Sequence, residues 1–178
     1  PILKFFANSL IVATITTILN VFCLAMAGYV FAKKRFRFKN TIFAILSLSM
    51  VIPTTALMSP VYNIITKLGL YDTKIALILV YTALNMPISL MVLRSAFASI
   101  PTELEEAAYI DGAGKWSAFK HVTLPMIRSS FTVCVFLSIV RCFMVFDVNL
   151  ALTGGGPFNS TELIALKVYN TAFTSMKF

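Results

Sequence analysis

The stretch that decides the fold is SLIVATITTILNVFCLAMAGYVF, residues 9–31, which carries no charged side chain. A helix needs about 20 apolar residues to cross the hydrocarbon core of a bilayer, and it satisfies its own backbone hydrogen bonds there. Lys4 is the one basic residue before this run and a basic cluster follows it, which is the reverse of a secretory signal peptide. Ser9 to Phe31 therefore predicts a membrane-spanning helix.

The composition of the whole chain also indicates a membrane protein. The 178 residues are 58% hydrophobic and 12% charged, and the mean hydropathy is +0.86. Soluble domains are about a quarter charged, because a domain of this size must cover its surface with polar groups. These values exclude an ordinary soluble enzyme.

Three further apolar runs and one partial run follow the first span. Pro53 and Pro87 lie inside two of the runs, where a proline removes a backbone hydrogen bond and bends the helix. We therefore predict an all-α integral membrane bundle with about four complete spans and a partial last helix. The further spans are predicted at Thr41–Met58, Ile75–Leu93 and Ser129–Phe146, with an outer loop at Ser59–Lys74, a break at Thr153–Pro157 and the partial helix from Thr161 onward.

Basic residues indicate which loops face the cytoplasm. The first span runs into a cluster of five basic residues, and positively charged loops stay on the cytoplasmic side. By alternation, the polar section Ser99–Arg128 is also cytoplasmic and the first span enters from outside. The net charge of +8 is thus a topology signal, and no nucleic acid partner is expected. The cluster consists of Lys33, Lys34, Arg35, Arg37 and Lys39.

The cytoplasmic loop from Arg94 to Arg128, here called the coupling loop, has the pattern of two short helices. Thr102 and Glu105 have the spacing of a capping box, which predicts a helix start. Gly112 and Gly114 would end this helix, and a second one would present Trp116 and Phe119. Leu104, Ala107, Ala108 and Asp111 would share one face of the first helix. A plain connector is the alternative, but a long ordered loop more often has a function.

One pattern in the coupling loop resembles a known family. Glu106-Ala107-Ala108, three residues, Gly112, nine residues and Val122-Thr123-Leu124-Pro125 are similar to the EAA signature of permease subunits of bacterial binding-protein-dependent ABC importers, with Val122 in place of Ile. The resemblance runs from about Asn8 to Phe173, and Leu152-Thr153-Gly154-Gly155-Gly156-Pro157 looks like the carbohydrate (maltose-type) branch. It implies a multi-pass subunit of the cytoplasmic membrane. Residues 1–178 would form one permease domain that ends before the last span, with an EAA loop at 94–128.

The resemblance also implies the partners and the docking residues. A dimer of cytoplasmic ABC ATPases would dock on the coupling loop, a second permease would complete the pathway, and an extracellular binding protein would deliver a sugar. Which permease half this chain represents stays open. Glu106 would offer a charge, Ala107 and Ala108 a close-packing face, and Trp116 either a docking contact or a membrane anchor. The docking set is Glu105, Glu106, Ala107, Ala108, Asp111, Gly112, Trp116, Leu124 and Pro125.

Polar residues inside spans are costly and indicate function by default. Arg141 lies midway along the fourth span, where helix packing and snorkelling are alternatives to a place on the substrate path. Sugars have apolar ring faces edged by hydroxyl groups, so aromatic and amide side chains suit them. The candidates for the substrate path are Tyr81, Asn85, Arg141, Phe143 and Asn149.

Signatures of enzymes are missing from the sequence. It has no Gly-rich phosphate loop with its lysine, so ATP and Mg²⁺ would be bound by the partner ATPase, and we expect no cofactor or metal site in this chain. His121 is interpreted as structural or as part of the docking surface, and Cys23, Cys134 and Cys142 as buried packing residues. Two alternatives remain: the same machine with a polyamine or phosphate cargo, and an ion-coupled secondary transporter. Membrane lipid is a partner in every case.

Overall fold

The computed structural model describes residues 2–144 and 146–174, and these residues contain helices and no β-strand. Their contacts divide the chain into two compact units. Unit 1 comprises Pro1–Asn20, Met50–Asn85 and Leu137–Phe178, and unit 2 comprises Val21–Ser49 and Met86–Phe136. The fold is the all-α arrangement that the sequence predicts, and the two units are described separately below.

Two helices are long and apolar enough to cross a membrane by themselves. They are α1 (Ile2–Lys33) and α4 (Lys74–Ala98), and they contain the predicted spans Ser9–Phe31 and Ile75–Leu93. Pro87 lies inside α4 without ending it. Counting each of two broken helix pairs as one span raises the total to four. The prediction of about four spans matches this upper count.

The predicted second span, Thr41–Met58, is wrong as one helix. The structure has α2 (Lys39–Leu48), a 3₁₀ turn (Ser49–Val51) and then α3 (Thr54–Lys67). Pro53 precedes α3 in an extended conformation. The helix is interrupted here because a proline has no N–H for the helical hydrogen bonds and also keeps the residue before it out of the helical region. The helix then runs on into the segment expected as an outer loop. At 1.5 Å per residue, α2 and α3 each fall short of the roughly 30 Å hydrocarbon core.

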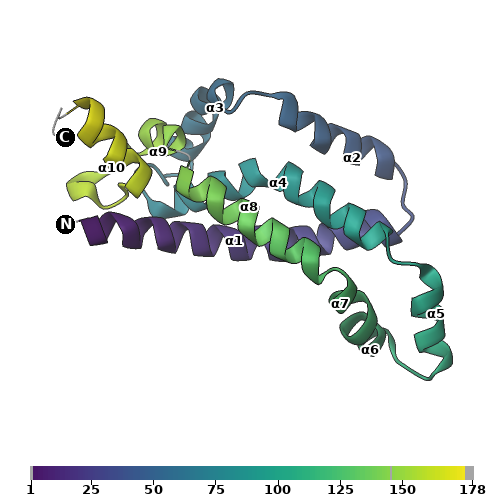
Figure 1. The fold of residues 1–178 in the computed structure, drawn as a ribbon. Coiled ribbons are helices and arrows are strands. Elements are labelled where there is room, and N and C mark those ends of the chain that lie inside the picture. The colour runs from purple at the N-terminus through teal and green to yellow at the C-terminus, as the bar shows by residue number, and fades with distance from the viewer. Residues whose placement is uncertain (1, 145, 175–178) are drawn as a thin grey trace. The chain divides into compact units, whose positions relative to one another are not determined.

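The coupling loop forms a chain of short helices before the fourth span. Figure 1 shows α5 (Thr102–Ile110), α6 (Lys115–Ala118) and α7 (Leu124–Met126) following α4, with a π-helical turn at Phe119–Thr123. The predicted pair of short helices is thereby confirmed. The predicted fourth span corresponds to α8 (Arg128–Met144), which is long and apolar enough to span only together with the preceding segment Lys115–Met126, from which it is bent by 63°. It ends before the predicted Phe146, while position 145 lies outside the described residues.

The last part of the chain is short and irregular. It has α9 (Asp147–Leu152), a 3₁₀ turn (Pro157–Asn159), α10 (Ile164–Tyr169) and a π-helical turn (Asn170–Thr174). The three glycines at 154–156 have positive φ and break the helix as predicted. The partial helix expected from Thr161 begins at Ile164, and its continuation beyond 174 lies outside the described residues.

Each unit has its own apolar core. In unit 1, α1, α4 and α9 contribute side chains such as Val12, Leu77 and Val148. In unit 2, Leu24 of α1 packs with Leu90 and Leu93 of α4, and a second cluster lies beneath the coupling loop. α1 and α4 lie close together at Gly28, where a Cβ would lie 3.0 Å from the Leu93 Cβ. A small residue at this point allows two helix backbones to pack together.

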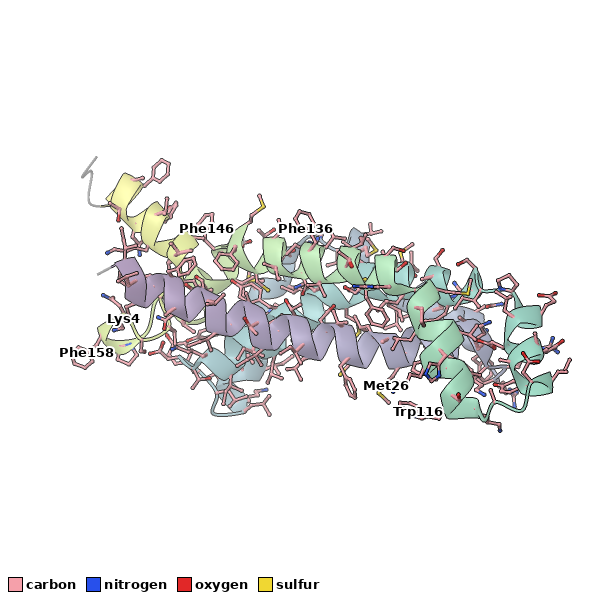
Figure 2. The ribbon with its side chains drawn as sticks, turned by 60° about the horizontal axis from the view of Figure 1, so that its bottom comes forward. Lys4, Met26, Trp116, Phe136, Phe146 and Phe158 are labelled. Atoms are coloured by element: carbon pink, nitrogen blue, oxygen red, sulfur yellow. The ribbon has the colours of Figure 1, made fainter. Side chains whose placement is uncertain are left out.

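The cysteines follow the prediction in two of three cases. Cys134 and Cys142 are buried, whereas Cys23 is exposed. Cys23 lies on a face of α1 that also exposes Phe22 and Met26, and Figure 2 shows Met26 pointing away from the helix. In a membrane protein such an apolar face is covered by lipid or by another subunit. An apolar sequence context alone does not separate this face from the packed face, and for that reason the prediction for Cys23 was wrong.

Candidate functional site

The first helix of the coupling loop ends in a well-defined cap. Gly112 has φ +85°, the Ala113 N–H donates to the Ala108 carbonyl at 2.9 Å, and the Gly112 N–H donates to the Tyr109 carbonyl at 3.1 Å. This pair of bonds is a Schellman motif, which requires a left-handed residue immediately after the helix. Glycine adopts that conformation without steric cost. The predicted turn at Gly112 is therefore confirmed.

The start of the same helix differs from the prediction. Thr102 is already helical and the capping position is taken by Pro101, with no side-chain cap. A capping box needs a free N–H at the capping residue for the glutamate to accept, and proline has none. Glu105 instead accepts a hydrogen bond from the Thr123 hydroxyl at 3.1 Å and pairs with Lys33 at 3.4 Å. The capping box is thus wrong, and Glu105 is turned toward the rest of unit 2.

The outward face of α5 carries part of the EAA pattern. Glu106 and Ala107 are exposed, Ala108 is half-buried, and Ile110 is 86% exposed. The face predicted for the first helix is therefore not uniformly exposed. Ala108 points toward the protein, as does Glu105 three residues before it. Ile110 was missed, although its spacing of four from Glu106 and three from Ala107 places it on the same face as both. Asp111 and Gly112 are also exposed.

The second half of the coupling loop exposes one aromatic ring and partly buries another. Trp116 is 75% exposed and stacks on Phe119 with ring centroids 5.7 Å apart, and Figure 2 shows it projecting from the helix. Phe119 is half-buried and meets Tyr29 of α1 edge to face at 6.1 Å. Leu124 and Pro125 are exposed. The His121 ring hydrogen-bonds within its own turn, to Ser117, which supports the structural interpretation of this residue.

A small core holds the coupling loop against the ends of the long helices. Phe97, Ile100 and Ile127 are buried together, and Tyr29 and Phe119 pack on them. Tyr29 also meets Phe97 edge to face at 5.5 Å. α1, α4 and the coupling loop therefore share one packed cluster in unit 2. The outward residues of the loop therefore stand on a packed apolar cluster.

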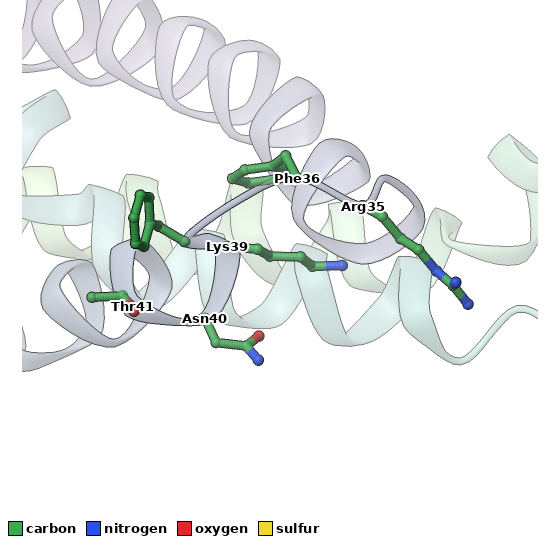
Figure 3. A pocket seen from close by; sticks show the side chains of 6 residues that line it. Arg35, Phe36, Lys39, Asn40 and Thr41 are labelled. Carbon is green, nitrogen blue, oxygen red and sulfur yellow. The ribbon is translucent and has the colours of Figure 1, made fainter.

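A basic pocket lies in unit 2 where α1 leads into α2. It has a volume of about 440 Å³, and Figure 3 shows its lining side chains. The Lys39 ammonium donates to the carbonyls of Ala32 and Lys34, so it caps the end of α1. Arg35 and Lys39 were predicted as part of the topology signal, and a pocket that contains them was not expected. The lining consists of Arg35, Phe36, Phe38, Lys39, Asn40 and Thr41.

All five candidates for the substrate path lie in unit 1, and four of them lie on α4 and α8. Asn85 of α4 is 5% exposed and accepts a hydrogen bond from Arg141 of α8 at 3.4 Å. Tyr81 lies one turn before Asn85 and is buried, and Phe143 packs against the cluster that contains Tyr81. Their role in binding a substrate stays a prediction. The arrangement gives an arginine, an amide and two aromatic rings in the same unit.

Asn149 has a different position and different partners. It is fully buried, and its amide nitrogen donates to the Thr153 hydroxyl at 2.8 Å and to the Thr161 carbonyl at 3.0 Å. Its amide oxygen accepts the Leu163 N–H at 3.0 Å. Both hydrogens of the amide are thus committed to the two ends of the loop Thr153–Ser160, here called the glycine loop. Asn149 shapes this loop, which is a role that the sequence did not indicate.

The glycine loop is also held from α1 and from the segment after α3. The Lys4 ammonium donates to the Phe158 carbonyl at 2.7 Å, and Figure 2 shows the two residues together. Thr161, directly after the loop, donates a hydrogen bond to Asp72 Oδ1 at 3.5 Å, and Gly156 has a φ of +69°, a conformation that favours glycine. The Phe158 side chain is 95% exposed. The loop is therefore fixed at its base and presents an aromatic side chain at its tip.

Known proteins match this chain over most of its length. A profile of the family described as "Binding-protein-dependent transport system inner membrane component" matches residues 24–178. The chain is 47% identical over 79 residues to the probable starch degradation products transport system permease protein AmyD of Thermoanaerobacterium thermosulfurigenes, covering 44% of this chain and 27% of the relative. It is 34% identical over 149 residues to the diacetylchitobiose uptake system permease protein NgcG of Streptomyces coelicolor, covering 84% and 49%.

A solved structure has the same fold. It is a crystal structure of a bacterial ABC transporter involved in the import of the acidic polysaccharide alginate, with a TM-score of 0.77 and 20% identity. The match covers 98% of this chain and 60% of that chain. At this identity the likeness concerns the fold. The chain spans about half or less of the length of the two sequence relatives named above.

Proposed function

The chain belongs to the family of binding-protein-dependent transport system inner membrane components, and from this premise we propose that it is the membrane-spanning permease subunit of an ATP-driven sugar importer. The observation that carries the proposal is the coupling loop, which holds the EAA pattern on a packed apolar cluster with Glu106, Ala107 and Ile110 exposed. Family membership favours binding-protein-dependent transport over the ion-coupled alternative.

The exposed residues of the coupling loop suit a protein partner. It combines a carboxylate at Glu106 with large apolar side chains at Ile110 and Trp116, which are 86% and 75% exposed. Large exposed apolar groups beside charges are typical of a binding surface. We propose that a dimer of cytoplasmic ATPases docks there, binds ATP and Mg²⁺, and performs the hydrolysis. Closure and reopening of the dimer would then switch the spans between outward-open and inward-open states.

A sugar or oligosaccharide is the proposed cargo. The names of the two relatives refer to starch degradation products and to diacetylchitobiose, both of which are carbohydrates. The pairing of Arg141 with Asn85, which lies one helical turn after Tyr81 in α4, offers the mixture of aromatic and polar groups that sugars require. Polyamine and phosphate remain the alternative cargoes, since the coupling loop reports the motor and not the substrate.

The remaining partners follow from the family. A second permease would complete the pathway, and a solute-binding protein would meet the glycine loop, where Phe158 is exposed. Membrane lipid would cover the exposed apolar face of α1. The pocket that contains Arg35 and Lys39 offers basic groups to phosphate head groups next to the first span.

Affinity purification of the full-length protein from its native membrane tests the proposal. Mass spectrometry of wild type should identify an ATPase, a second permease and a binding protein. Glu106→Lys should lose the ATPase while the protein still inserts in the membrane, because the substitution places a positive charge where a negative one is needed. A reversal of equal size at the exposed Lys67, Lys67→Glu, is the control and should keep the ATPase. Normal assembly of Glu106→Lys would contradict the docking role.

Uptake experiments in the same cells distinguish the cargoes. Labelled oligosaccharides, a polyamine and phosphate are supplied in turn to cells with and without the permease. Permease-dependent uptake of an oligosaccharide alone supports the sugar proposal, and uptake of phosphate or a polyamine instead would refute it.

A further inference from the structure

Adjacent glutamates of α5 have opposite surroundings. Successive residues of a helix are rotated by about 100°, so Glu105 and Glu106 cannot face the same way. Glu106 is exposed, whereas the side chain of Glu105 is 15% exposed and that of its partner Lys33 is 12% exposed. The two residues belong to one sequence pattern and yet contact different parts of the molecule.

Lys33 and Glu105 form the centre of a small polar network. The Lys33 ammonium lies 3.4 Å from Glu105 Oε1 and also donates to the Ile100 carbonyl at 3.0 Å. The Thr123 hydroxyl donates to the same Oε1 at 3.1 Å, and Thr123 is buried. Within the described residues, this is the one ion pair closer than 4.0 Å. A charge at this level of burial is retained only when it is paired and hydrogen-bonded.

The network joins the parts of unit 2 that would have to move together. Lys33 is the last residue of α1, Ile100 precedes α5, Glu105 lies in α5, and Thr123 ends the π-helical turn. Both halves of the coupling loop are therefore tied to one point at the end of a spanning helix. Apolar packing of Phe119 on Tyr29 also connects the coupling loop to α1, but this contact is not directional.

From this geometry we infer that Glu105 is a positioning residue: through Lys33 it links displacement of the coupling loop to α1, while Glu106 meets the ATPase. The inference rests on the proposed function. It assigns different tasks to two adjacent glutamates and gives Lys33, a residue outside the EAA pattern, a part in transport. A charged pair suits this task because its attraction resists separation of the loop from the helix in every direction.

The test measures docking and coupling separately in the full transporter. Glu105→Gln keeps the shape and an acceptor for Thr123 but removes the charge that faces Lys33. We expect the ATPase to co-purify in the wild-type amount and to hydrolyse ATP, while uptake per ATP hydrolysed falls by about fivefold or more, the usual range for a lost coupling between two sites. Glu106→Lys should give the opposite result, because here the bound ATPase itself is lost.

Conservative variants separate positioning from simple folding. Lys33→Arg keeps the charge and should retain most of the uptake per ATP, whereas Lys33→Met should behave like Glu105→Gln. If the Glu105→Gln variant couples as well as wild type, the inference is refuted. It is refuted equally if protein amount, bound ATPase and uptake all fall in parallel, because a purely structural role predicts that result.

A measurement on the permease alone distinguishes this inference from the proposed function. Thermal unfolding of wild type, Lys33→Met, Glu105→Gln and the double variant forms a double-mutant cycle. The shift of the double variant should be smaller than the two single shifts combined, because either change already breaks the pair, and additive shifts would refute the tie. If the wild-type permease does not co-purify with an ATPase, the proposed function and the coupling role of Glu105 are both refuted. This holds even if the double-mutant cycle confirms the interaction of Lys33 with Glu105.

Discussion

Gly28 of α1 provides the sharpest test of the packing in unit 2. A Cβ at this position would lie 3.0 Å from the Leu93 Cβ, 3.1 Å from the Arg94 nitrogen and 3.2 Å from the Leu93 carbonyl carbon. Ordinary contacts begin at 3.4 Å, so each approach is too close, by up to 0.4 Å. Two of the three atoms belong to the backbone of α4 and cannot rotate away. Gly28→Ala must therefore move α1 away from α4.

The expected free-energy change combines two opposing terms. Overpacking of a well-packed core costs about 1–3 kcal/mol. Alanine is favoured over glycine inside a helix by about 0.5–1 kcal/mol, which offsets part of that cost. The net loss of roughly 0–2.5 kcal/mol corresponds to a fall of up to about 10 °C in the unfolding midpoint for a chain of this size. Gly28→Val should lower the midpoint further.

Thermal unfolding of the purified full-length permease in detergent measures this loss. Ala7 is exposed in the same helix, so Ala7→Gly reports the helix propensity term without a packing term and should cost about 0.5–1 kcal/mol. If Gly28→Ala instead raises the midpoint by the amount that Ala7→Gly lowers it, α1 and α4 do not approach closely at Gly28 and the packing described for unit 2 is wrong.

Three further predictions concern unit 1. Gly156→Ala places a Cβ 2.5 Å from the Thr161 hydroxyl at a φ of +69°, so limited proteolysis should cut the glycine loop faster than in wild type, and an equal rate would contradict the fit. Asn149→Leu leaves the Thr161 carbonyl and the Leu163 N–H without their partner, which costs about 1–3 kcal/mol for each buried group. The unfolding midpoint should fall, and an unchanged midpoint would count against the network. Arg141→Leu should reduce uptake while the ATPase still co-purifies, and unchanged uptake would remove Arg141 from the substrate path.

The sequence predicted the long helices well because an uncharged apolar run has one stable form in lipid. α1 extends the predicted span Ser9–Phe31 by seven residues at its start and two at its end, and α4 extends Ile75–Leu93 by one and five. The second span was less accurate, since hydropathy does not distinguish a bent helix from two helices separated by Pro53. Pro87 lies inside an unbroken helix, so a proline alone does not decide between the two outcomes.

The coupling loop was predicted in outline but not in its contacts. The two short helices and the turn at Gly112 follow from local rules of capping and glycine conformation. The partners of Glu105 do not, because Lys33 is far from it in the sequence and was explained by the topology of the first span. Asn149 was placed on the substrate path for a similar reason: its polarity was visible in the sequence, whereas its bonds to the glycine loop depend on the folded chain.

The glycine loop has a consequence for the energetics of any protein that binds it. Gly154, Gly155, Gly156, Phe158 and Asn159 all have positive φ, and Asn149 and Lys4 hold the loop by hydrogen bonds. A loop that already has one conformation loses little conformational entropy on association, whereas each flexible side chain ordered at an interface costs about 0.5–1.5 kcal/mol. The conformational entropy of the glycine loop is lost when the permease folds and not when a partner binds. Contact through Phe158 would then require few new interactions for a given affinity.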